Sequence, residues 1–301
     1  MPMSAPTHKT TSQLVAARLG LAADRAPQIL LALPKSDAFA QLLEAHFTQG
    51  GWSVRVAQDL QDALREPATS LVILDAAGAE AQAVLDQLKL NPATNPVPVI
   101  VLFPRGHHPQ RPAALRIQAD LELIEPFQVY QFLEAIERVL VRFAQTRAAD
   151  PHRLHLILPS TQADLDRACE IAAGLFRAAV LPDGEQAPLL AAFREAVGNA
   201  IQHGNRCEPA KTVRVEYHQD AARITVSVRD EGEGFDFRPY LRQGAEGDAA
   251  EAARARHREG GQGGLGILMM VRSTDHIEYN ERGNAVTFTK NLPSASPQEA
   301  I

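Results

Sequence analysis

Three polar side chains that could do chemistry follow one another at helical spacing in the C-terminal half. Glu195, Asn199 and His203 are four residues apart, so on a helix they stand in one line along the same face. A carboxylate can orient or deprotonate a hydroxyl group, and an amide oxygen is a suitable ligand for Mg²⁺. For these three residues alone a solvated polar helix face is the simpler interpretation, so the chemistry needs support from elsewhere in the sequence.

A second candidate group lies at the end of a predicted strand, Ile224–Val228. The segment 230–236 reads DEGEGFD, and Asp230 can accept a hydrogen bond from an amino group. Gly232 and Gly234 allow another group to approach the backbone closely. Taken alone, this pattern is also compatible with a simple turn.

A glycine-rich loop precedes a predicted helix over Leu265–Ser273. Residues 260–267 read GGQGGLGI, and backbone N–H groups at such a helix start can bind phosphate. The spacing matches neither the GxGxxG fingerprint nor the P-loop pattern, so neither a Rossmann site nor a P-loop is supported. A flexible hinge is the alternative interpretation, and it is compatible with phosphate binding.

The elements that must position these residues are helices segregated from hairpin-like strands. Leu190, Phe193, Val197 and Ile201 form a stripe that predicts a core-facing helix over Gln186–His203. The other predicted elements are a strand at 155–158, a helix capped by Ser160 or Thr161, strands at 213–217 and 224–228, and strands near 277–279 and 285–289. This order indicates an α+β sandwich, in which one antiparallel-rich sheet lies under a helical layer.

The N-terminal half has a different pattern, in which strands and helices alternate. Apolar runs predict strands at 29–33, 52–56, 71–74, 97–103 and 121–124, with helices over 38–48, 81–90 and 128–147. Alternation of this kind predicts a parallel sheet covered on both faces, and we expect a flavodoxin-like α/β domain. The small, polar stretch Ala144–Pro151 is the expected boundary between the two halves.

Length and composition limit the classes of protein. A chain of 301 residues predicts about two domains, and we place a polar tail at 1–25, domains at 26–146 and 151–294, and a second tail at 295–301. Hydrophobic residues make up 45% and charged residues 22%, as in soluble globular proteins. No apolar run is long enough to cross a bilayer.

Charge and cysteine content narrow the expected partners and location. The formal net charge of −6 argues against a general nucleic-acid binder. Cys169 and Cys207 suit neither a disulfide framework nor a zinc site, and the N-terminus lacks the apolar core of a secretory signal. We therefore expect a cytoplasmic protein that binds other proteins or a nucleotide, without a membrane partner.

Taken in order, the three C-terminal motifs resemble the ATP-binding domain shared by gyrase, Hsp90, histidine kinases and MutL, the GHKL ATPases. The anti-sigma factor serine kinase branch is the most similar, over about 151–292. The segments that carry the resemblance are EAVGNAIQHGN (195–205), DEGEGFD (230–236), GGLGILMMVRSTDHIEYN (263–280) and GNAVTFTK (283–290). The resemblance implies a Bergerat-type α/β sandwich that binds ATP with Mg²⁺.

The resemblance also implies a role for each motif residue. Glu195 matches the carboxylate that orients the acceptor hydroxyl group or water, and Asn199 matches the Mg²⁺ ligand. His203 matches a histidine next to the nucleotide, and Asp230 the aspartate that binds the adenine amino group. The positions beside the base, the phosphates and the lid hinge are Gly232, Gly234, Gly263, Gly264, Leu265 and Gly266. Phe237–Gly260 corresponds to the ATP lid, from which Arg254, Arg256 or Arg258 could reach a γ-phosphate.

The first domain, over about 27–143, resembles a response-regulator receiver that has lost its phosphorylation chemistry. Asp75 stands where the family has its phosphoacceptor. The surrounding site is replaced, with Leu33 and Pro34 for the acidic pair, Phe103 for a serine or threonine, and Glu125 for a lysine. Without that acidic pair and lysine, Asp75 lacks the Mg²⁺ and the cation that phosphoryl transfer needs. We expect a pseudo-receiver that serves binding or dimerisation.

Together the two resemblances imply a regulator of a bacterial partner-switching pathway. The expected activity is a serine/threonine protein kinase that acts on a STAS-type antagonist, sequesters a sigma factor, or does both, as a homodimer. A non-catalytic, ATP-gated protein-interaction module is one alternative. Another is an atypical histidine kinase, for which His152 and His155 are the candidate acceptors. A DNA-binding regulator is disfavoured because no helix-turn-helix pattern or basic stripe is present.

Overall fold

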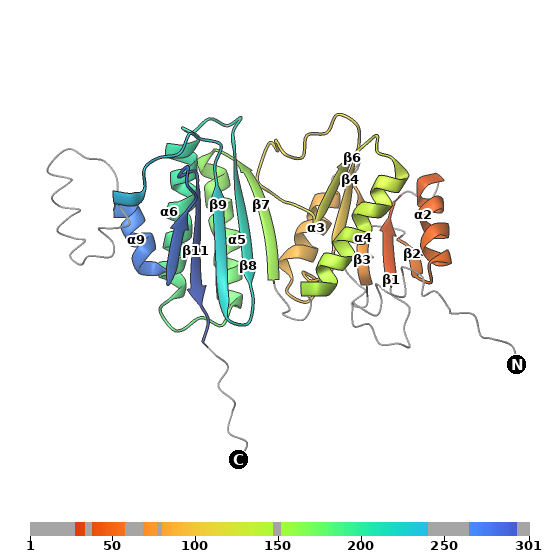
Figure 1. The fold of residues 1–301 in the computed structure, drawn as a ribbon, viewed down its shortest axis with the longest axis horizontal. Coiled ribbons are helices and arrows are strands. Elements are labelled where there is room, and N and C mark those ends of the chain that lie inside the picture. The colour runs from red at the N-terminus through yellow and green to blue at the C-terminus, as the bar shows by residue number, and fades with distance from the viewer. Residues whose placement is uncertain are drawn as a thin grey trace, which may run out of the picture. The chain divides into compact units, whose positions relative to one another are not determined.

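The protein consists of two compact units, each with its own β-sheet (Figure 1). The computed structural model describes residues 28–33, 38–57, 69–76, 80–146, 152–239 and 265–293. The first unit comprises residues 1–109 and 117–151, and the second comprises 110–116 and 152–301. The predicted tails at 1–25 and 295–301 lie outside the described residues. Within the described ranges, no helix combines the length and the apolar character that a membrane span requires.

The first unit contains a five-stranded sheet in the order β2-β1-β3-β4-β6, with all neighbours parallel. Its elements are β1 (Gln28–Ala32), α2 (Ala38–Gln49), β2 (Ser53–Val56), β3 (Thr69–Asp75), α3 (Glu80–Leu90), β4 (Val99–Phe103), β6 (Leu121–Ile124) and α4 (Val129–Thr146). This strand order is that of flavodoxin-like proteins. The predicted parallel α/β fold is therefore confirmed, with small shifts at the ends of the elements.

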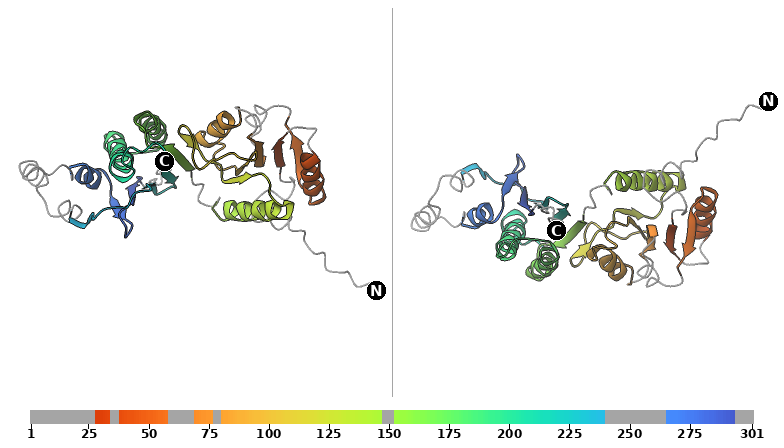
Figure 2. Two further views of the ribbon diagram at one scale, coloured as in Figure 1. Left: turned by 90° about the horizontal axis from the view of Figure 1, so that it is seen from above. Right: turned by 90° about the horizontal axis from the view of Figure 1, so that it is seen from below.

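Burial on both faces explains why the strands of this sheet are continuous apolar runs. Neighbouring residues of β3 belong to different clusters, because successive side chains point to opposite faces. Ile73 packs in a cluster with Phe47 of α2 and Phe132 of α4, whereas Val72 packs in a cluster with Leu85 of α3. Figure 2 shows α3 on the opposite side of the sheet from α2 and α4.

The ends of these strands carry the residues at which the resemblance to receivers places the phosphorylation site. Asp75 ends β3, and Phe103 ends the neighbouring strand β4. The ring of Phe103 is buried and stacks on His107, with ring centroids 4.6 Å apart. Leu33 is buried after β1, and Glu125 follows β6. The proline that follows Leu33 lies outside the described residues. Buried apolar side chains, those of Leu33 and Phe103, therefore stand at two positions where the resemblance to receivers predicts polar groups.

The second unit contains a six-stranded sheet in the order β10-β11-β9-β8-β7-β5. Its elements are β5 (Arg116–Ile117), β7 (His152–Pro159), α5 (Gln162–Ala178), α6 (Gln186–Asn199), a π-helix η3 (Ala200–Gly204), β8 (Thr212–Gln219), β9 (Arg223–Arg229), α9 (Leu265–Ser273), β10 (His276–Tyr279) and β11 (Ala285–Asn291). The strands from β7 to β10 pair antiparallel. The predicted α+β sandwich is confirmed, whereas strand β5 has no counterpart in the prediction.

Alternating burial along the strands shows which face of this sheet is covered. In β9 the residues Ile224, Val226 and Val228 are buried, while those between them are only partly buried. Helices α5, α6 and α9 lie on one side of the sheet, as Figure 2 shows. Phe176 of α5 and Phe193 of α6 meet edge to face in this core, with ring centroids 6.2 Å apart. The sandwich therefore has one helical layer over one sheet.

Two local predictions about these helices have different outcomes. Thr161 is the N-cap of α5, because its side chain accepts a hydrogen bond from Asp164 N at 3.2 Å. The predicted helix over Gln186–His203 is confirmed in extent, but its last turn is the π-helix η3, which follows α6 directly after Asn199. A π-turn widens the helix by one residue and occurs often at functional sites.

Candidate functional site

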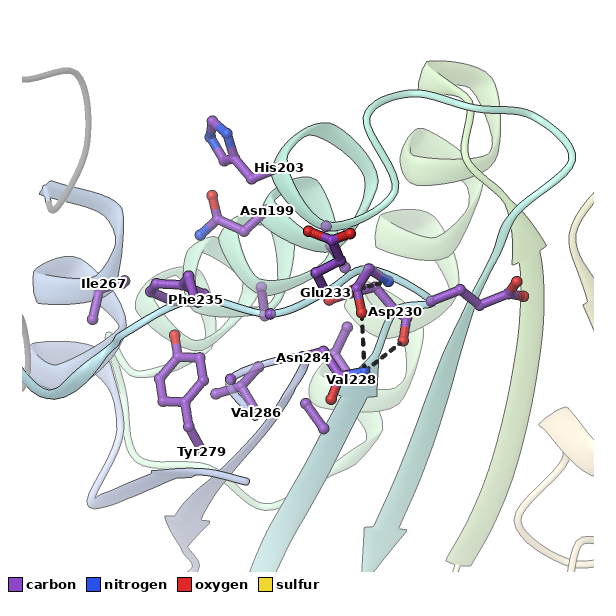
Figure 3. A pocket seen from close by; sticks show the side chains of 18 of the residues that line it. Asn199, His203, Val228, Asp230, Glu233, Phe235, Ile267, Tyr279, Asn284 and Val286 are labelled. Atoms are coloured by element: carbon purple, nitrogen blue, oxygen red, sulfur yellow. Dashed lines mark hydrogen bonds between the residues drawn. The ribbon is translucent and has the colours of Figure 1, made fainter. Parts of the chain in front are cut away.

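The second unit contains a cavity of about 610 Å³ between the helices and one end of the sheet (Figure 3). This volume is in the range of small-molecule sites. Seven of the predicted site residues line it: Glu195, Asn199, His203, Asp230, Gly232, Gly234 and Gly266. Leu265 begins α9, while Gly263 and Gly264 lie outside the described residues. Most of the predicted lid Phe237–Gly260 also lies outside the described residues, including the three candidate arginines Arg254, Arg256 and Arg258.

Glu195 and Asn199 form a hydrogen-bonded pair on the last turn of α6. Asn199 Nδ2 donates to Glu195 Oε1 at 3.1 Å, and both side chains are partly buried. A Cβ atom at Gly266 would collide with the Glu195 carboxylate, so the start of α9 lies directly against that group. Because the amide nitrogen of Asn199 donates to Glu195, the amide oxygen is the atom of Asn199 that can ligate a cation. His203, on η3, is exposed beside Asn199 at the same wall (Figure 3).

Asp230 follows β9 and is held by its own backbone turn. Its Oδ1 accepts a hydrogen bond from Gly232 N at 2.7 Å. Burial raises the pKa of the Asp230 carboxyl, and the hydrogen bond from Gly232 and the charge of Arg282 only partly oppose this. A carboxylate that has lost water gains strongly from a new hydrogen-bond donor. Asp230 is therefore suited to bind an amino group of a ligand.

Two glycines allow Asp230 to lie as close to η3 as it does. A Cβ at Gly204 would collide with the Asp230 carboxyl, and one at Gly232 would collide with Gly204 O. Two further glycines join the Asp230 loop to the turn after β10. Gly234, with φ of +83°, lies against Arg282 O, and Gly283, with φ of +77°, lies against Phe235 O.

Replacing Gly234 by alanine is expected to destabilise the second unit by about 2–4 kcal/mol, because strain at positive φ adds to a backbone collision. Gly184→Ala is the matched control. Gly184 has the same φ of +83° but would place its Cβ within 4 Å of nothing. The control should therefore cost only about 1 kcal/mol. Thermal or urea unfolding measures both, and equal losses would contradict the close approach.

Several residues that the sequence did not single out hold this loop in place. Asp230 N donates to Asn284 O at 3.1 Å, while Asn284 Nδ2 lies 3.3 Å from Asp230 O and 3.5 Å from Gly232 O (Figure 3). Asn280 Oδ1 accepts hydrogen bonds from three successive backbone N–H groups, 283–285. The fully buried Asn205 accepts from Glu231 N at 2.8 Å. Asn205 and Asn284 both lie within segments that carry the family resemblance, and this was the only feature of the sequence that pointed to them.

An aromatic and aliphatic wall faces these polar groups. The Tyr279 ring stacks on Phe237 with centroids 4.8 Å apart and meets Phe235 edge-on at 5.6 Å. Burial is the main cause that raises the pKa of the Tyr279 phenol, and the negative charge of Glu195 adds to it, so the phenol is neutral. The aliphatic side chains that line the cavity are those of Val228, Ile267, Met270 and Val286. A flat heterocycle with an amino group would contact this wall while its amino group faces Asp230.

A family comparison agrees with this geometry. The model of the histidine kinase-like ATPase domain matches residues 158–290, an interval that contains all the residues lining the cavity. Residues 158–290 are a histidine kinase-like ATPase domain. The serine-protein kinase RsbW of Listeria innocua serovar 6a is 28% identical over 112 residues. That alignment covers 36% of this chain and 67% of the Listeria protein.

Receiver domains and response regulators are among the solved structures that are similar to the chain. A response regulator from Thermotoga maritima is 17% identical, with a TM-score of 0.30, and covers 38% of this chain and 98% of its own. The signal receiver domain of a signal transduction histidine kinase from Syntrophus aciditrophicus is 21% identical, with a TM-score of 0.32. It covers 38% of this chain and 90% of its own. The first unit is receiver-like by its strand order and its alternation of strands and helices, independently of these scores.

Proposed function

We propose that the ATPase-like domain binds Mg·ATP and that the protein is a serine/threonine kinase regulator of a partner-switching pathway. The observation that supports the proposal is that the Asp230 carboxyl and the hydrogen-bonded pair Glu195–Asn199 line the same cavity. The proposed partner is a STAS-type antagonist, a sigma factor, or both. A cytoplasmic location and a homodimer are part of the proposal and rest on the family resemblance alone.

The donor set suits a magnesium ion that arrives with a nucleotide. Mg²⁺ prefers oxygen ligands and is usually held by one or two protein groups together with substrate phosphates. Asn199 Oδ1 is such a ligand, with Glu195 beside it. In the part of the chain that the structure describes, no three His, Cys, Asp or Glu side chains form a metal cluster. Bound there, Mg²⁺ would neutralise charge on the phosphates.

The chain's own groups then have separate tasks. Asp230 accepts a hydrogen bond from the adenine amino group and so places the nucleotide base. Glu195 orients the hydroxyl group of the acceptor serine or threonine and takes its proton. A bond then forms from that oxygen to the γ-phosphorus as the bond to the β,γ-bridging oxygen breaks, which leaves ADP. Positioning and charge stabilisation supply most of the catalysis in such transfers.

The two alternative functions, an atypical histidine kinase and a non-catalytic module, require different features of the structure. An atypical histidine kinase would need an acceptor histidine on a helix before the ATPase domain. His152 and His155 both lie on strand β7, and His152 packs edge-on against Tyr217. A non-catalytic module would use the same nucleotide pocket, so it differs only in the role of Glu195.

Calorimetry with Mg·ATP and Mg·GTP tests the proposed site directly. We expect micromolar binding of Mg·ATP and about 10- to 100-fold weaker binding of Mg·GTP. At the ring position of the adenine amino group, guanine presents a carbonyl oxygen, which cannot donate to the partly buried Asp230 carboxylate. Absence of ATP binding at millimolar concentration would contradict the proposal, and so would equal affinity for the two nucleotides.

A further inference from the structure

A short segment between two strands of the first sheet belongs to the second unit. Residues Gln110–Arg116, which we call the strap, lie in the connection between β4 and β6 but group with the ATPase-like domain. At the end of the strap, strand β5 extends the second sheet beyond β7. The ATPase-like domain is therefore completed by residues that precede its own first long strand by more than thirty positions.

Arg111 of the strap contacts the loop that carries Asp230. Arg111 Nη1 donates to Glu231 Oε1 at 2.7 Å and to Ala210 O at 2.8 Å. Glu231 Oε1 also accepts from Thr212 N at 3.1 Å and from Thr212 Oγ1 at 2.6 Å. Glu231 is the residue directly after Asp230. Its carboxylate thus joins the loop to the strap and to the start of β8.

The charge state of Glu231 is consistent with this role. Burial is the largest single influence and raises the pKa of the Glu231 carboxyl. The hydrogen bonds from Thr212 and Arg111, with the Arg111 charge, outweigh it and hold the pKa below its ordinary value. At neutral pH the carboxylate is therefore charged and accepts from all its donors.

The other end of the strap is anchored as well. Leu115 N donates to Asp164 Oδ1 at 2.7 Å, and Leu115 and Arg116 are buried. Asp164 in turn accepts from the N-cap residue Thr161 at 2.6 Å through its other oxygen. Because Asp164 belongs to α5, the strap is tied to a helix of the domain core. The strap that carries Arg111 is therefore anchored to α5 at its other end.

We propose that Arg111 is a positioning residue of the nucleotide site. Through Glu231 it holds the Asp230–Gly232 turn in the conformation that presents the Asp230 carboxyl to a ligand. The inference rests on the proposed nucleotide binding, and it makes that binding sensitive to the strap. Since the chain continues from both ends of the strap into β4 and β6, the receiver-like unit has a covalent route to the nucleotide site.

The expected effect is small but measurable. Arg111 is 54% exposed and Glu231 32%, and ion pairs of this kind contribute up to about fivefold to an equilibrium. Arg111→Ala should therefore weaken Mg·ATP binding by about two- to fivefold. Arg111→Lys should retain most of the affinity, because a single nitrogen of Arg111 makes both contacts and an ammonium group can replace it.

Arg194→Ala is a matched control for the loss of an exposed ion pair. Arg194 Nη2 lies 2.7 Å from Asp166 Oδ1, with exposures of 53% and 50%, and neither residue lines the cavity. This control should leave the ATP affinity unchanged. In a double-mutant cycle, Arg111→Ala should have little further effect in a Glu231→Ala background, because the two side chains act through one contact.

Amide hydrogen exchange of the full-length protein without nucleotide supplies an independent readout. Arg111→Ala should speed exchange at Glu231 and Gly232, whereas Arg194→Ala should not. Unchanged exchange at these amides together with an unchanged Kd would overturn the inference, and so would an equal effect of Arg194→Ala. If the wild type binds no nucleotide, the proposed function fails, while faster or unchanged exchange at these two amides still decides the role of Arg111.

Discussion

Mg·ATP should bind the Asp230→Ala variant about 100-fold more weakly than the wild type, because a charge-assisted hydrogen bond to the base is lost in a partly buried site. The cavity offers Asp230 as the acceptor for an amino group, and the facing wall is aromatic and aliphatic. The adenine amino group would then enter the cavity without a partner. Calorimetry measures the loss.

The control for this prediction is Asp183→Ala. Asp183 is an exposed aspartate that does not line the cavity, so its loss changes the net charge equally without touching the site. Unfolding curves should show that Asp230→Ala stays folded, since removal of a partly buried carboxylate relieves its desolvation. An Asp230→Ala variant that is folded and binds ATP as well as the wild type would refute the assignment of the base site.

The same group predicts how nucleotide binding depends on pH. Burial raises the pKa of Asp230 in the free protein, which favours the neutral form. An amino group that donates to the carboxylate favours the charged form, so binding releases a proton in this pH range. Affinity should therefore fall as the pH is lowered through the raised pKa. This fall should begin at a higher pH than for an exposed aspartate, and it should be absent in Asp230→Asn.

The fold was predictable from the sequence because each sheet has its own periodicity. Strands buried on both faces, such as β3 and β4, appear as continuous apolar runs, whereas β9 shows strict alternation. Strand β5 was not predictable, because two residues carry no period and its pairing with the second sheet is a long-range contact. The π-helix η3 was missed for a similar reason, since a change to i→i+5 bonding leaves no mark in composition.

The site residues that belong to a sequence motif were predictable. The residues that hold them in place through long-range contacts were not. Glu195, Asn199 and Asp230 stand at the motif positions, and all three line the cavity. The asparagines that hold the loop, Asn205 and Asn284, act through contacts with residues 26 and 54 positions away. A single sequence shows their type but not their neighbours. The contact of Arg111 with Glu231 spans 120 positions and was invisible for the same reason.

Glu195→Gln should abolish phosphoryl transfer while leaving Mg·ATP affinity within about twofold. A glutamine keeps an oxygen that can accept the hydrogen bond from Asn199 Nδ2, which Glu195 Oε1 accepts at 3.1 Å, so the geometry is retained. It carries no charge and cannot take the proton of the attacking hydroxyl group. General-base groups contribute about 10²- to 10⁴-fold to such rates. The measurement is transfer of labelled γ-phosphate from ATP to a recombinant STAS-domain antagonist protein, beside ATP calorimetry on the same samples.

Glu216→Gln is the control, because Glu216 is exposed on β8 and does not line the cavity. Transfer that is lost in Glu195→Gln but kept in Glu216→Gln supports a kinase, and an acid-stable label on the acceptor places the phosphate on a hydroxyl group and not on a histidine. Transfer that persists in a folded, ATP-binding Glu195→Gln variant would refute the role of Glu195. A wild type that binds ATP and switches partner affinity without any transfer would favour the non-catalytic module. In that module the Glu195–Asn199 pair would act only through the metal, so Glu195→Gln should leave partner switching unchanged.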